Sequence, residues 1–371
     1  MSTFYITFIN LYNENNKGIH QKIISQCRVL KRKLSKNTFY TSRVFETAIL
    51  FCDGKIIKRE PANDRRRYCD VILKWMREYQ AELIYSRYHF SDVILSDFFK
   101  DVKKMGLPII IEIPTYPYDG ELKEGLRKYE DTTYRESLIK YADIISTYSE
   151  DSVIWNKHCI NLVNGIDSLN ICDKFGSIEK KGIFLISVLS MNTWHGLERL
   201  IKGFYNYYCS KKNHDPEIYL IAIGDGPERG NYEALSNRYG LKDYISFVGA
   251  INHDELNDYY LKSDIAVDAL GLYKKGMDKA CSIKGAEYCA KGMPIVSGYV
   301  DLRFPDDLQF VYHVPNDETP VNMFGVVDWF KDLSKDKEYK INISNYAKEN
   351  LTWDSIMQPV VDYYKTVCDK N

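Results

Sequence analysis

A lysine and a glutamate three residues apart stand at the start of an expected helix, in the segment Ser282-Ile283-Lys284-Gly285-Ala286-Glu287-Tyr288. Ser282 suits the N-cap position, so the free amides from Ile283 onward and the positive end of the helix dipole would be ready for a phosphate. Lys284 would add a cation, and the carboxylate of Glu287 can accept two hydroxyl donors, such as those of a ribose. A capped helix with one surface Lys–Glu pair is the alternative interpretation.

Two glycine-containing turns follow other expected strands. Gly224-Asp225-Gly226 follows the strand 217–223, and Trp194-His195-Gly196 follows the strand 184–190. Ligands of doubly wound α/β sheets bind at the carboxyl ends of the strands. We therefore expect both turns to bind a ligand, with His195 contacting a phosphate oxygen. The alternatives are a plain strand-to-helix turn at Gly224, and a buried Trp194 beside a surface His195.

The stretch 112–121 gathers aromatic, acidic and hydroxyl side chains where a further strand ends. Aromatic faces together with carboxylate acceptors suit a sugar ligand. A rigid proline-rich connection would explain the prolines equally well, but not the density of polar residues. The residues expected to bind an acceptor or sugar are Thr115, Tyr116, Tyr118, Asp119 and Glu121, with Gly18 at the turn between the first strand and the first helix.

Several common catalytic motifs are absent from the sequence. No G-x-G-x-x-G follows a strand and no G-x-x-x-x-G-K-[ST] occurs, which argues against nicotinamide dehydrogenases and P-loop enzymes. The seven histidines have no metal-ligand spacing, so metal catalysis is unsupported. The nine cysteines form no C-x-x-C pair, which favours reduced thiols in a cytoplasm over a disulfide framework or a zinc site.

The 371 residues alternate strand-like and helical patterns in two consecutive blocks. The alternation over the first 170 residues is typical of a parallel sheet flanked by helices, and it restarts after a polar joint at 173–181. We expect the first helix over 19–34, strands joined by the turn Asp53-Gly54 over 39–60, and the last helix over 351–367. The fold class is therefore α/β, with two doubly wound domains.

Basic residues are concentrated in the first part of the chain. The whole sequence has a formal net charge of −1, but residues 1–100 contain 18 Lys and Arg against 10 Asp and Glu. The overall balance gives no sign of a nucleic-acid partner. Clusters at 28–36 and 65–67 suit an anionic membrane surface or an anionic ligand, although a solvated helix face explains them as well. We find no signal peptide and no membrane-spanning segment, so we expect any membrane contact to be peripheral.

With these residues in place, the chain resembles family 4 of the retaining, nucleotide-sugar-dependent glycosyltransferases, and within it the bacterial capsule and exopolysaccharide enzymes. The most specific stretch is 263–297, where SDIAVDALGLYKKG and SIKGAEYCAKGMPIVS look like that subgroup's strand, basic loop and Ser-x-Lys-x-x-Glu-Tyr-x-Ala-x-Gly-x-Pro helix. The likeness covers nearly the whole length, because it extends to Gly224–Glu228, Trp194–Gly196 with Arg199, 164–167, 112–121 and the helix at Trp353.

This resemblance implies a GT-B fold, in which two Rossmann-like domains face a central cleft and the last helix crosses back to the first domain. Residues 1–172 with the helix 353–371 would bind the acceptor, and residues 173–352 would bind the nucleotide-sugar. The family uses no metal, so helix N-termini and cations of the protein must stabilise the leaving diphosphate. Transfer with retention is commonly described as a front-face displacement, which requires no nucleophile from the protein.

The same resemblance assigns roles in the donor site. Lys284 would supply the positive charge beside the diphosphate, and Glu287 would bind the ribose. The backbone of Phe247, Val248 and Gly249 would hold the base. No cofactor is implied beyond the nucleotide-sugar itself, which is a co-substrate.

Four positions depart from the pattern of the family. Many members carry a second glutamate eight residues before the position of Glu287, where this chain has Lys279. Their arginine and lysine in the turn before the first helix of the second domain fall here at about Ser190 and His195, and their first-domain histidine aligns with Pro114 or Thr115. These changes fit either a variant site or a catalytically inactive paralogue.

The expected function is transfer of a hexose or related sugar from a UDP-sugar to a lipid-linked or glycan acceptor, in the assembly of a surface polysaccharide. The expected location is the cytoplasm, with the basic first domain as a potential contact to the inner face of the membrane. A non-catalytic GT-B subunit that partners a glycosyltransferase, and a sugar-nucleotide epimerase, are the alternatives.

Overall fold

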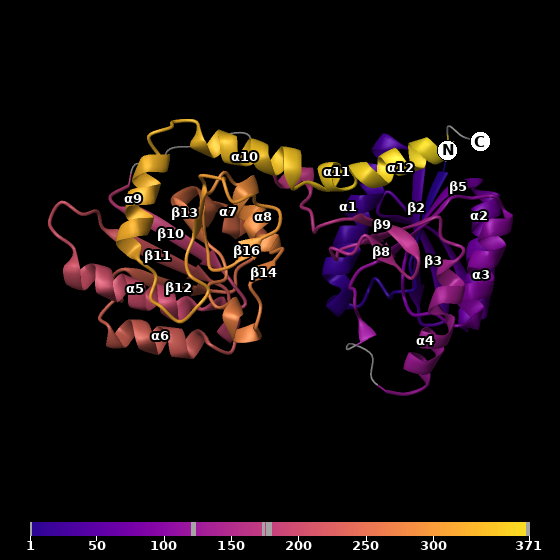
Figure 1. The fold of residues 1–371 in the computed structure, drawn as a ribbon, viewed down its shortest axis with the longest axis horizontal. Helices are drawn as coiled ribbons and strands as arrows, with labels where there is room; N and C mark the ends of the chain where they lie inside the picture. The colour runs from indigo at the N-terminus through magenta and orange to yellow at the C-terminus, as the bar shows by residue number, and fades with distance from the viewer. Residues whose placement is uncertain (1, 120–123, 173–174, 176–179, 369–371) are drawn as a thin grey trace. The chain divides into compact units, whose positions relative to one another are not determined.

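The computed structural model describes residues 2–119, 124–172, 175 and 180–368, and the chain divides into two compact units. Unit 1 comprises Met1–Val163 and Ile356–Asn371, and unit 2 comprises Asn164–Ser355 (Figure 1). Each unit is built around its own mainly parallel sheet covered by helices, as the alternating pattern of the sequence predicts.

The sheet of unit 1 has nine strands in the order β4-β3-β2-β1-β5-β6-β7-β9-β8. The strands β2, β1, β5, β6, β7 and β9 are parallel to their neighbours in this order, whereas β3, β4 and β8 join by antiparallel pairing. The strands are β1 (Ser2–Ile6), β2 (Asn37–Val44), β3 (Thr47–Cys52), β4 (Lys55–Pro61), β5 (Ala81–Arg87), β6 (Ile109–Ile113), β7 (Ile144–Thr147), β8 (Val153–Ile154) and β9 (Lys157–Asn161).

Alternate side chains of the central strands of unit 1 pack on opposite faces of the sheet. Phe4 and Ile6 pack in the main hydrophobic core with residues of α2 (Arg65–Glu78), α3 (Val93–Lys104) and α4 (Leu126–Ile139). Tyr5, between them, donates a hydrogen bond to Gln26 of α1 (Lys17–Lys33). Because side chains alternate across a strand, both faces of this sheet are covered, as a buried parallel sheet requires.

The sheet of unit 2 has six strands, all parallel, in the order β12-β11-β10-β13-β15-β17. The strands are β10 (Ile183–Val188), β11 (Ile218–Ile223), β12 (Ile245–Gly249), β13 (Ile265–Val267), β15 (Ile295–Ser297) and β17 (Val311–His313), with β14 (Lys279–Ala280) and β16 (Val300–Asp301) paired separately. Leu185 packs with α5 (Leu197–Ser210), α6 (Arg229–Arg238) and α9 (Met323–Leu333), whereas Ile186 packs with α7 (His253–Lys262), α8 (Ile283–Ala290) and α10 (Tyr339–Asn350).

Both sheets contain a point where the strand order reverses. In unit 1 the chain moves from β1 to β2 on one side and returns through β5 on the other side. In unit 2 it moves outward from β10 to β11 and β12, then returns to β13 beside β10. Side chains just after β1 and β5, and just after β10 and β13, therefore lie where open α/β sheets bind ligands.

Most of the expected elements are confirmed, and two differ in detail. The turn Asp53-Gly54 joins β3 to β4, with positive φ angles of 51° and 76°. Gly18 lies inside α1, which begins at Lys17, and not at a turn before it. The single helix expected over 351–367 is divided into α11 (Trp353–Ile356) and α12 (Gln358–Cys368). Pro359 explains the division, because a proline inside a helix removes a backbone donor and clashes with the preceding turn.

The last helix packs on unit 1, as the expected return to the first domain requires. Tyr364 of α12 is fully buried and donates a hydrogen bond to the carbonyl of Ile84 in β5. Met357 and Val360 are also fully buried. In the part of the chain that the structure describes, no helix has both the length and the apolar character needed to span a membrane.

Candidate functional site

A cavity of about 600 Å³ opens at the carboxyl ends of β10 and β13, where the strand order of unit 2 reverses. The turns after β10, β11 and β12 and the start of α8 contribute to its wall. It brings together four of the positions expected to bind a donor, Trp194, His195, Gly224 and Ser282, with the expected catalytic residue Lys284. Its full lining is Val188, Leu189, Ser190, Trp194, His195, Gly224, Asp225, Ala250, Asp268, Ala269, Leu272, Ala280, Ser282, Lys284 and Tyr299.

Ser282 caps α8 as the sequence predicts. Its Oγ accepts hydrogen bonds from the backbone N–H groups of Lys284 (3.1 Å) and Gly285 (3.3 Å), and its hydroxyl donates to Asp268 Oδ1 (3.3 Å). Two of the amides expected to be free for a phosphate are thus already bound by the cap. The positive end of the helix dipole still points toward the cavity, because Ser282 and Lys284 both line it.

Substitution of Ser282 tests this cap. We expect Ser282→Ala to lower the free energy of unfolding by about 1 kcal/mol, because the amides of Lys284 and Gly285 lose their acceptor. Urea denaturation followed by circular dichroism would measure the change. Ser282→Thr keeps the hydroxyl, so its free energy of unfolding should fall much less. Equal stability of the alanine and wild-type proteins would contradict the capping role.

Lys284 and Glu287 form an ion pair at the rim of the cavity. The Nζ of Lys284 lies 2.6 Å from Oε2 of Glu287, and the two side chains are 36% and 25% exposed. Glu287 itself is not among the residues that line the cavity, nor is Ile283, whose side chain is 54% exposed. An anion in the cavity could therefore draw the ammonium of Lys284 away from its partner without breaking the core.

His195 presents one fixed tautomer to its surroundings. Its Nδ1 accepts a hydrogen bond from the backbone N–H of Asn192 at 3.0 Å, so the neutral ring carries its proton on Nε2. Burial lowers the pKa of His195 below its ordinary value, and the positive charge of Lys275 acts in the same direction. A neutral imidazole with an N–H donor is the resulting state near pH 7. The ammonium of Lys275 lies over the ring of the adjacent Trp194, 4.4 Å from the ring centroid.

Close backbone contacts explain the glycines of the two turns. A Cβ on Gly224, which has a φ of +118°, would lie 1.8 Å from the carbonyl oxygen of Leu189. A Cβ on Gly196, with a φ of +64°, would lie 2.7 Å from the amide nitrogen of Gly271. Only glycine lets the ends of the strands approach so closely, which shapes this side of the cavity.

The three residues expected beside the base lie at the end of β12. Phe247 and Val248 are half-buried and pack against the hydrophobic clusters on the two sides of the sheet. Gly249 accepts a hydrogen bond from the amide of Gly224 at 2.8 Å through its carbonyl, which links β12 to the turn after β11. The next residue, Ala250, is the one that lines the cavity.

Asp268 is a buried carboxylate that the sequence analysis missed. It follows β13 and is only 5% exposed, and it accepts hydrogen bonds from Tyr299 (2.8 Å), from the amide of Ala269 (2.8 Å) and from Ser282. Burial raises the pKa of this carboxyl above its usual range, although these hydrogen bonds oppose the shift. Its position directly after a strand beside the switch point was a signal that could have identified it.

Two buried arginines donate hydrogen bonds to the backbone of segments that contribute to the cavity wall. Arg303 pairs with Asp301 and donates hydrogen bonds to the carbonyls of Ser282 and Asn164, so it anchors the segment that leads into α8. Arg199 is 1% exposed and donates to the carbonyls of Leu270, Pro315 and Thr319. These contacts make both arginines structural.

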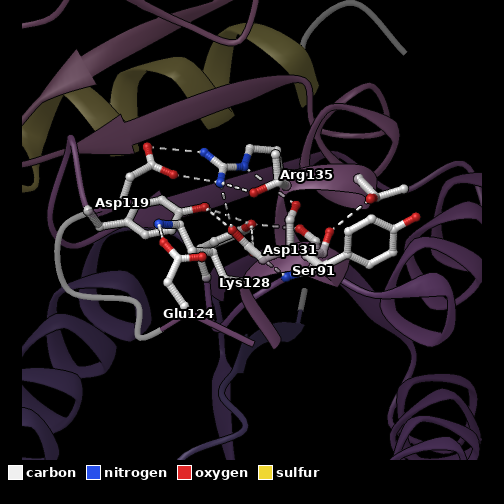
Figure 2. A network of polar contacts seen from close by, with 11 residues as sticks. Ser91, Asp119, Glu124, Lys128, Asp131 and Arg135 are labelled. Carbon is white, nitrogen blue, oxygen red and sulfur yellow. Dashed lines mark hydrogen bonds and ion pairs between the residues drawn. The ribbon is translucent and has the colours of Figure 1, made fainter. Parts of the chain in front are cut away.

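Side chains at the end of the described part of the stretch 112–121 already have partners within unit 1, and Figure 2 shows Asp119 beside Arg135. Tyr118 is buried and donates a hydrogen bond to Asp131 at 2.7 Å, and Asp119 forms an ion pair with Arg135 at 2.7 Å. Tyr116 packs edge-on against the ring of Trp155. These three residues therefore fix the stretch to α4 and β8–β9.

The remaining positions expected at the acceptor site are scattered. Thr115 is exposed and, with Tyr118, lines a second cavity in unit 1. Gly18 faces open space, since nothing lies within 4 Å of a Cβ placed on it. Glu121 lies outside the described residues. Among residues 2–119, 124–172, 175 and 180–368, we find no group of three or more His, Cys, Asp or Glu side chains arranged to hold a metal ion.

Comparison with known proteins finds a similarity to a family model in the region that contains the cavity at the switch point of unit 2. Residues 172–306 match the family model described as "Glycosyl transferases group 1". An "Uncharacterized glycosyltransferase YqgM" of Bacillus subtilis is 27% identical over 175 residues, which are 44% of this chain and 46% of that protein. The matched region thus spans less than half of the length of this curated relative.

Solved structures match the fold over the whole chain. A glycosyltransferase from Rickettsia africae aligns with a TM-score of 0.66 at 11% identity and covers 100% of this chain and 99% of its own. The pneumococcal O-GlcNAc transferase GtfA, solved with UDP and GlcNAc, aligns with a TM-score of 0.51 at 10% identity and covers 100% and 99%. The fold is that of the GT-B glycosyltransferases, as expected from the sequence.

Proposed function

We propose that this protein is a glycosyltransferase that moves a sugar from a nucleotide-sugar to an acceptor. One observation carries the proposal: Lys284, the capped start of α8 and His195 line one cavity at the switch point of unit 2. That cavity lies within the region that matches the glycosyl transferases group 1 model. A cation, a helix N-terminus and a neutral donor in one cavity suit a diphosphate.

Lys284 is proposed to stabilise the leaving diphosphate. Charge develops on the oxygen of the leaving phosphate as the glycosidic bond breaks, and a cation already in place lowers the barrier most when it does not have to move far. In the structure its ammonium pairs with Glu287 at 2.6 Å. The ammonium would leave Glu287 as charge develops on the leaving diphosphate, and the carboxylate oxygen of Glu287 that is outside this ion pair can accept hydrogen bonds from the ribose hydroxyls before that.

Asp268 is the candidate for a contact to the donor sugar. Lys279, which stands where many related enzymes have a glutamate, is exposed on β14 and does not line the cavity. Asp268 does line it, and its carboxyl is held in place by Tyr299 and Ser282. A fixed carboxyl inside the cavity can bind sugar hydroxyls in place of the missing glutamate.

The finer assignments also belong to this proposal. We propose a UDP-sugar donor, transfer with retention and without a metal, and a lipid-linked or glycan acceptor in the assembly of a surface polysaccharide. Support for UDP comes from the fold shared with GtfA, which was solved with UDP. Contact of the basic first part of the chain with a membrane has weaker support, because Lys31 pairs with Asp53 and Arg65 with Asp92.

Binding of UDP tests the donor site directly. We expect UDP, more than GDP, ADP or dTDP, to raise the melting temperature of the purified protein, since a ligand at 100 times its Kd stabilises the folded state by about 2.7 kcal/mol. Differential scanning fluorimetry would measure the shift. It should be largely lost in Glu287→Ala and kept in Glu233→Ala, which removes a partner of Arg229 outside the cavity.

The opposite result would favour a different class of protein. If no nucleotide raises the melting temperature, the absence of the first glutamate points to a non-catalytic subunit that binds another protein or a glycan. A larger melting-temperature shift with GDP, ADP or dTDP would still support a glycosyltransferase, but one whose donor carries a base other than uracil.

A further inference from the structure

One continuous part of the cavity at the switch point of unit 2 is apolar. Five of the lining residues also pack against one another in a small hydrophobic cluster, and the three buried ones are at most 7% exposed. We call these five the apolar wall: Trp194, Ala269, Leu272, Ala280 and Tyr299. Polar residues such as Ser282 and Lys284 line other parts of the cavity. A ligand that fills the cavity therefore meets an apolar surface as well as a charge.

Backbone contacts hold the apolar wall in place. The turn after β13 is tied to the turn after β10, because the amide of Leu270 donates to the carbonyl of His195 (2.9 Å) and the amide of Gly271 donates to the carbonyl of Trp194 (3.2 Å). Ala280 belongs to β14, which pairs with β16 outside the main sheet. The apolar wall is therefore positioned by the fold itself, and a ligand that covers it does not have to order these segments first.

Asp268 lies directly beside the apolar wall and lines the same cavity. It precedes Ala269 in the chain, and its Oδ2 accepts a hydrogen bond from the hydroxyl of Tyr299 at 2.8 Å. Its Oδ1 accepts from the amide of Ala269 at 2.8 Å and from the hydroxyl of Ser282 at 3.3 Å. A carboxylate has about four acceptor sites, so these three hydrogen bonds leave it able to accept one more.

Neighbouring charged side chains have partners of their own. Asp301 pairs with Arg303 at 2.6 Å, and Lys284 pairs with Glu287 at 2.6 Å. Among the described residues, no lysine or arginine forms an ion pair with Asp268 itself. All of its donors are neutral. A neutral N–H or O–H of a ligand would extend this set, whereas a carboxylate of the ligand would be repelled.

An acetamido group combines the two features that this part of the cavity offers. Its methyl group gains free energy when apolar side chains cover it, while a bare hydroxyl in the same place would lose water without gaining a partner. Its N–H, close to that methyl group, is a donor of the kind that a carboxylate accepts. A sugar with such a group therefore suits both Asp268 and the apolar wall, whereas an acidic sugar suits neither.

We propose that the donor sugar is an N-acetylamino sugar, whose acetyl methyl packs on the apolar wall and whose amide N–H donates a hydrogen bond to Asp268. The proposal rests on the glycosyltransferase function proposed above and names the class of sugar that the donor carries. A simple hexose presents a hydroxyl at the same carbon, so it can still bind Asp268 but leaves the apolar wall uncovered. The apolar wall then distinguishes the two classes of donor.

Isothermal titration calorimetry with matched pairs of donors tests this proposal. UDP, UDP-glucose, UDP-N-acetylglucosamine, UDP-galactose and UDP-N-acetylgalactosamine are titrated separately into the full chain. In at least one pair we expect the acetamido sugar to bind at least about tenfold more tightly than the hexose, since burial of the methyl group adds to the hydrogen bond. UDP alone is the reference for contacts that do not involve the sugar.

Asp268→Asn tests the polar contact. Asparagine keeps the size of the side chain but removes its charge, and a hydrogen bond to a neutral acceptor is weaker than one to a carboxylate. We expect the acetamido donor to bind about fivefold more weakly, with the Kd of UDP unchanged. An equal loss of affinity for UDP would overturn this contact, because Asp268 would then act on the nucleotide.

Ala280→Val tests the apolar contact. The larger side chain takes space that the acetyl methyl would occupy, so the acetamido donor should bind about tenfold more weakly, while UDP and the hexose donor keep their affinities. Lys279→Val is the matched control, because Lys279 precedes Ala280 on β14, is exposed and does not line the cavity. It should leave the affinities for both donors unchanged.

The possible failures give different patterns. If neither UDP nor a UDP-sugar binds, the proposed function is contradicted and this proposal falls with it. If UDP binds but neither acetamido sugar is preferred over its hexose, only the class of sugar is wrong. The same conclusion follows if Ala280→Val weakens UDP and both donors equally, because the apolar wall then contacts the nucleotide. Acetamido-sugar binding that Asp268→Asn and Ala280→Val both leave unchanged would overturn the assignment of these contacts.

Discussion

Replacement of Lys284 by alanine is expected to lower kcat by about 10²–10³-fold, the usual loss when one preorganised stabilising group is removed from a transition state. Lys284 is the one lysine among the described residues that line the cavity at the switch point of unit 2. Its removal would take away the cation that we propose to stabilise the leaving diphosphate, while the dipole of α8 and the neutral His195 remain. The measurement is the steady-state rate of nucleotide release from the UDP-sugar that stabilises the protein.

The fold should tolerate this substitution. The ion pair of Lys284 with Glu287 is partly exposed, and such i,i+3 pairs contribute only about 0.3–0.5 kcal/mol. Lys335→Ala is a matched control, since Lys335 also pairs with a carboxylate three residues away, Asp332, but outside the cavity. It should leave kcat unchanged. Full activity of Lys284→Ala would refute the site assignment.

Whether Lys284→Ala changes kcat or KM shows whether the lysine acts on the bound substrate or on the transition state. If Lys284 binds the diphosphate equally in the ground state and the transition state, KM should rise with little change in kcat. If its ammonium leaves Glu287 only as charge develops on the leaving group, kcat should fall instead. The 2.6 Å ion pair favours the second outcome, because Glu287 competes for the ammonium before the bond breaks.

The cavity at the switch point of unit 2 could be located largely from sequence because its residues follow strands. Gly224, His195 and Ser282 are each close to the end of an expected strand or the start of an expected helix, and the parallel order of the sheet brings these ends to one edge. The glycines mark the same places for a steric reason, since Gly224 lies against the carbonyl of Leu189. Local pattern and sheet topology together were sufficient here.

Other features could not be predicted, because they depend on contacts between segments that are distant in sequence. Arg303 holds the segment before α8 through Ser282 and Asn164, which are far from it in sequence, and no local pattern encodes that contact. Tyr118 and Asp119 have the residue types of a sugar site, yet Asp131 and Arg135 bind them inside unit 1. Residue type alone could not distinguish a side chain that awaits a ligand from one that already has a partner.

The buried charges of unit 1 give the largest expected change in stability. Arg87→Met should lower the free energy of unfolding by about 3–5 kcal/mol, because it leaves a buried carboxylate without its closest cation. Glu112 is fully buried. Burial alone would raise the pKa of its carboxyl, but Lys22, Arg87 and hydrogen bonds from Gln26 and Tyr85 outweigh burial and lower it. Lys22, at 3.9 Å, compensates only in part for the lost arginine.

Adding Glu112→Gln should restore a large part of this loss. Glutamine removes the buried negative charge, and its amide can still take part in hydrogen bonds with Gln26, Tyr85 and Tyr148. Lys22 can adapt as well, since burial already lowers its pKa to about 8, so loss of its proton requires little additional free energy. Urea denaturation of wild type, both single variants and the double variant forms a complete cycle.

The sign of the coupling energy between the two substitutions shows whether Arg87 and Glu112 stabilise each other in the folded protein. If the double variant is more stable than Arg87→Met, the arginine serves chiefly to neutralise Glu112, and the cost of the single substitution comes from the uncompensated carboxylate. If the two losses simply add, Arg87 and Glu112 do not stabilise each other, and the ion pair in the structure contributes nothing to folding.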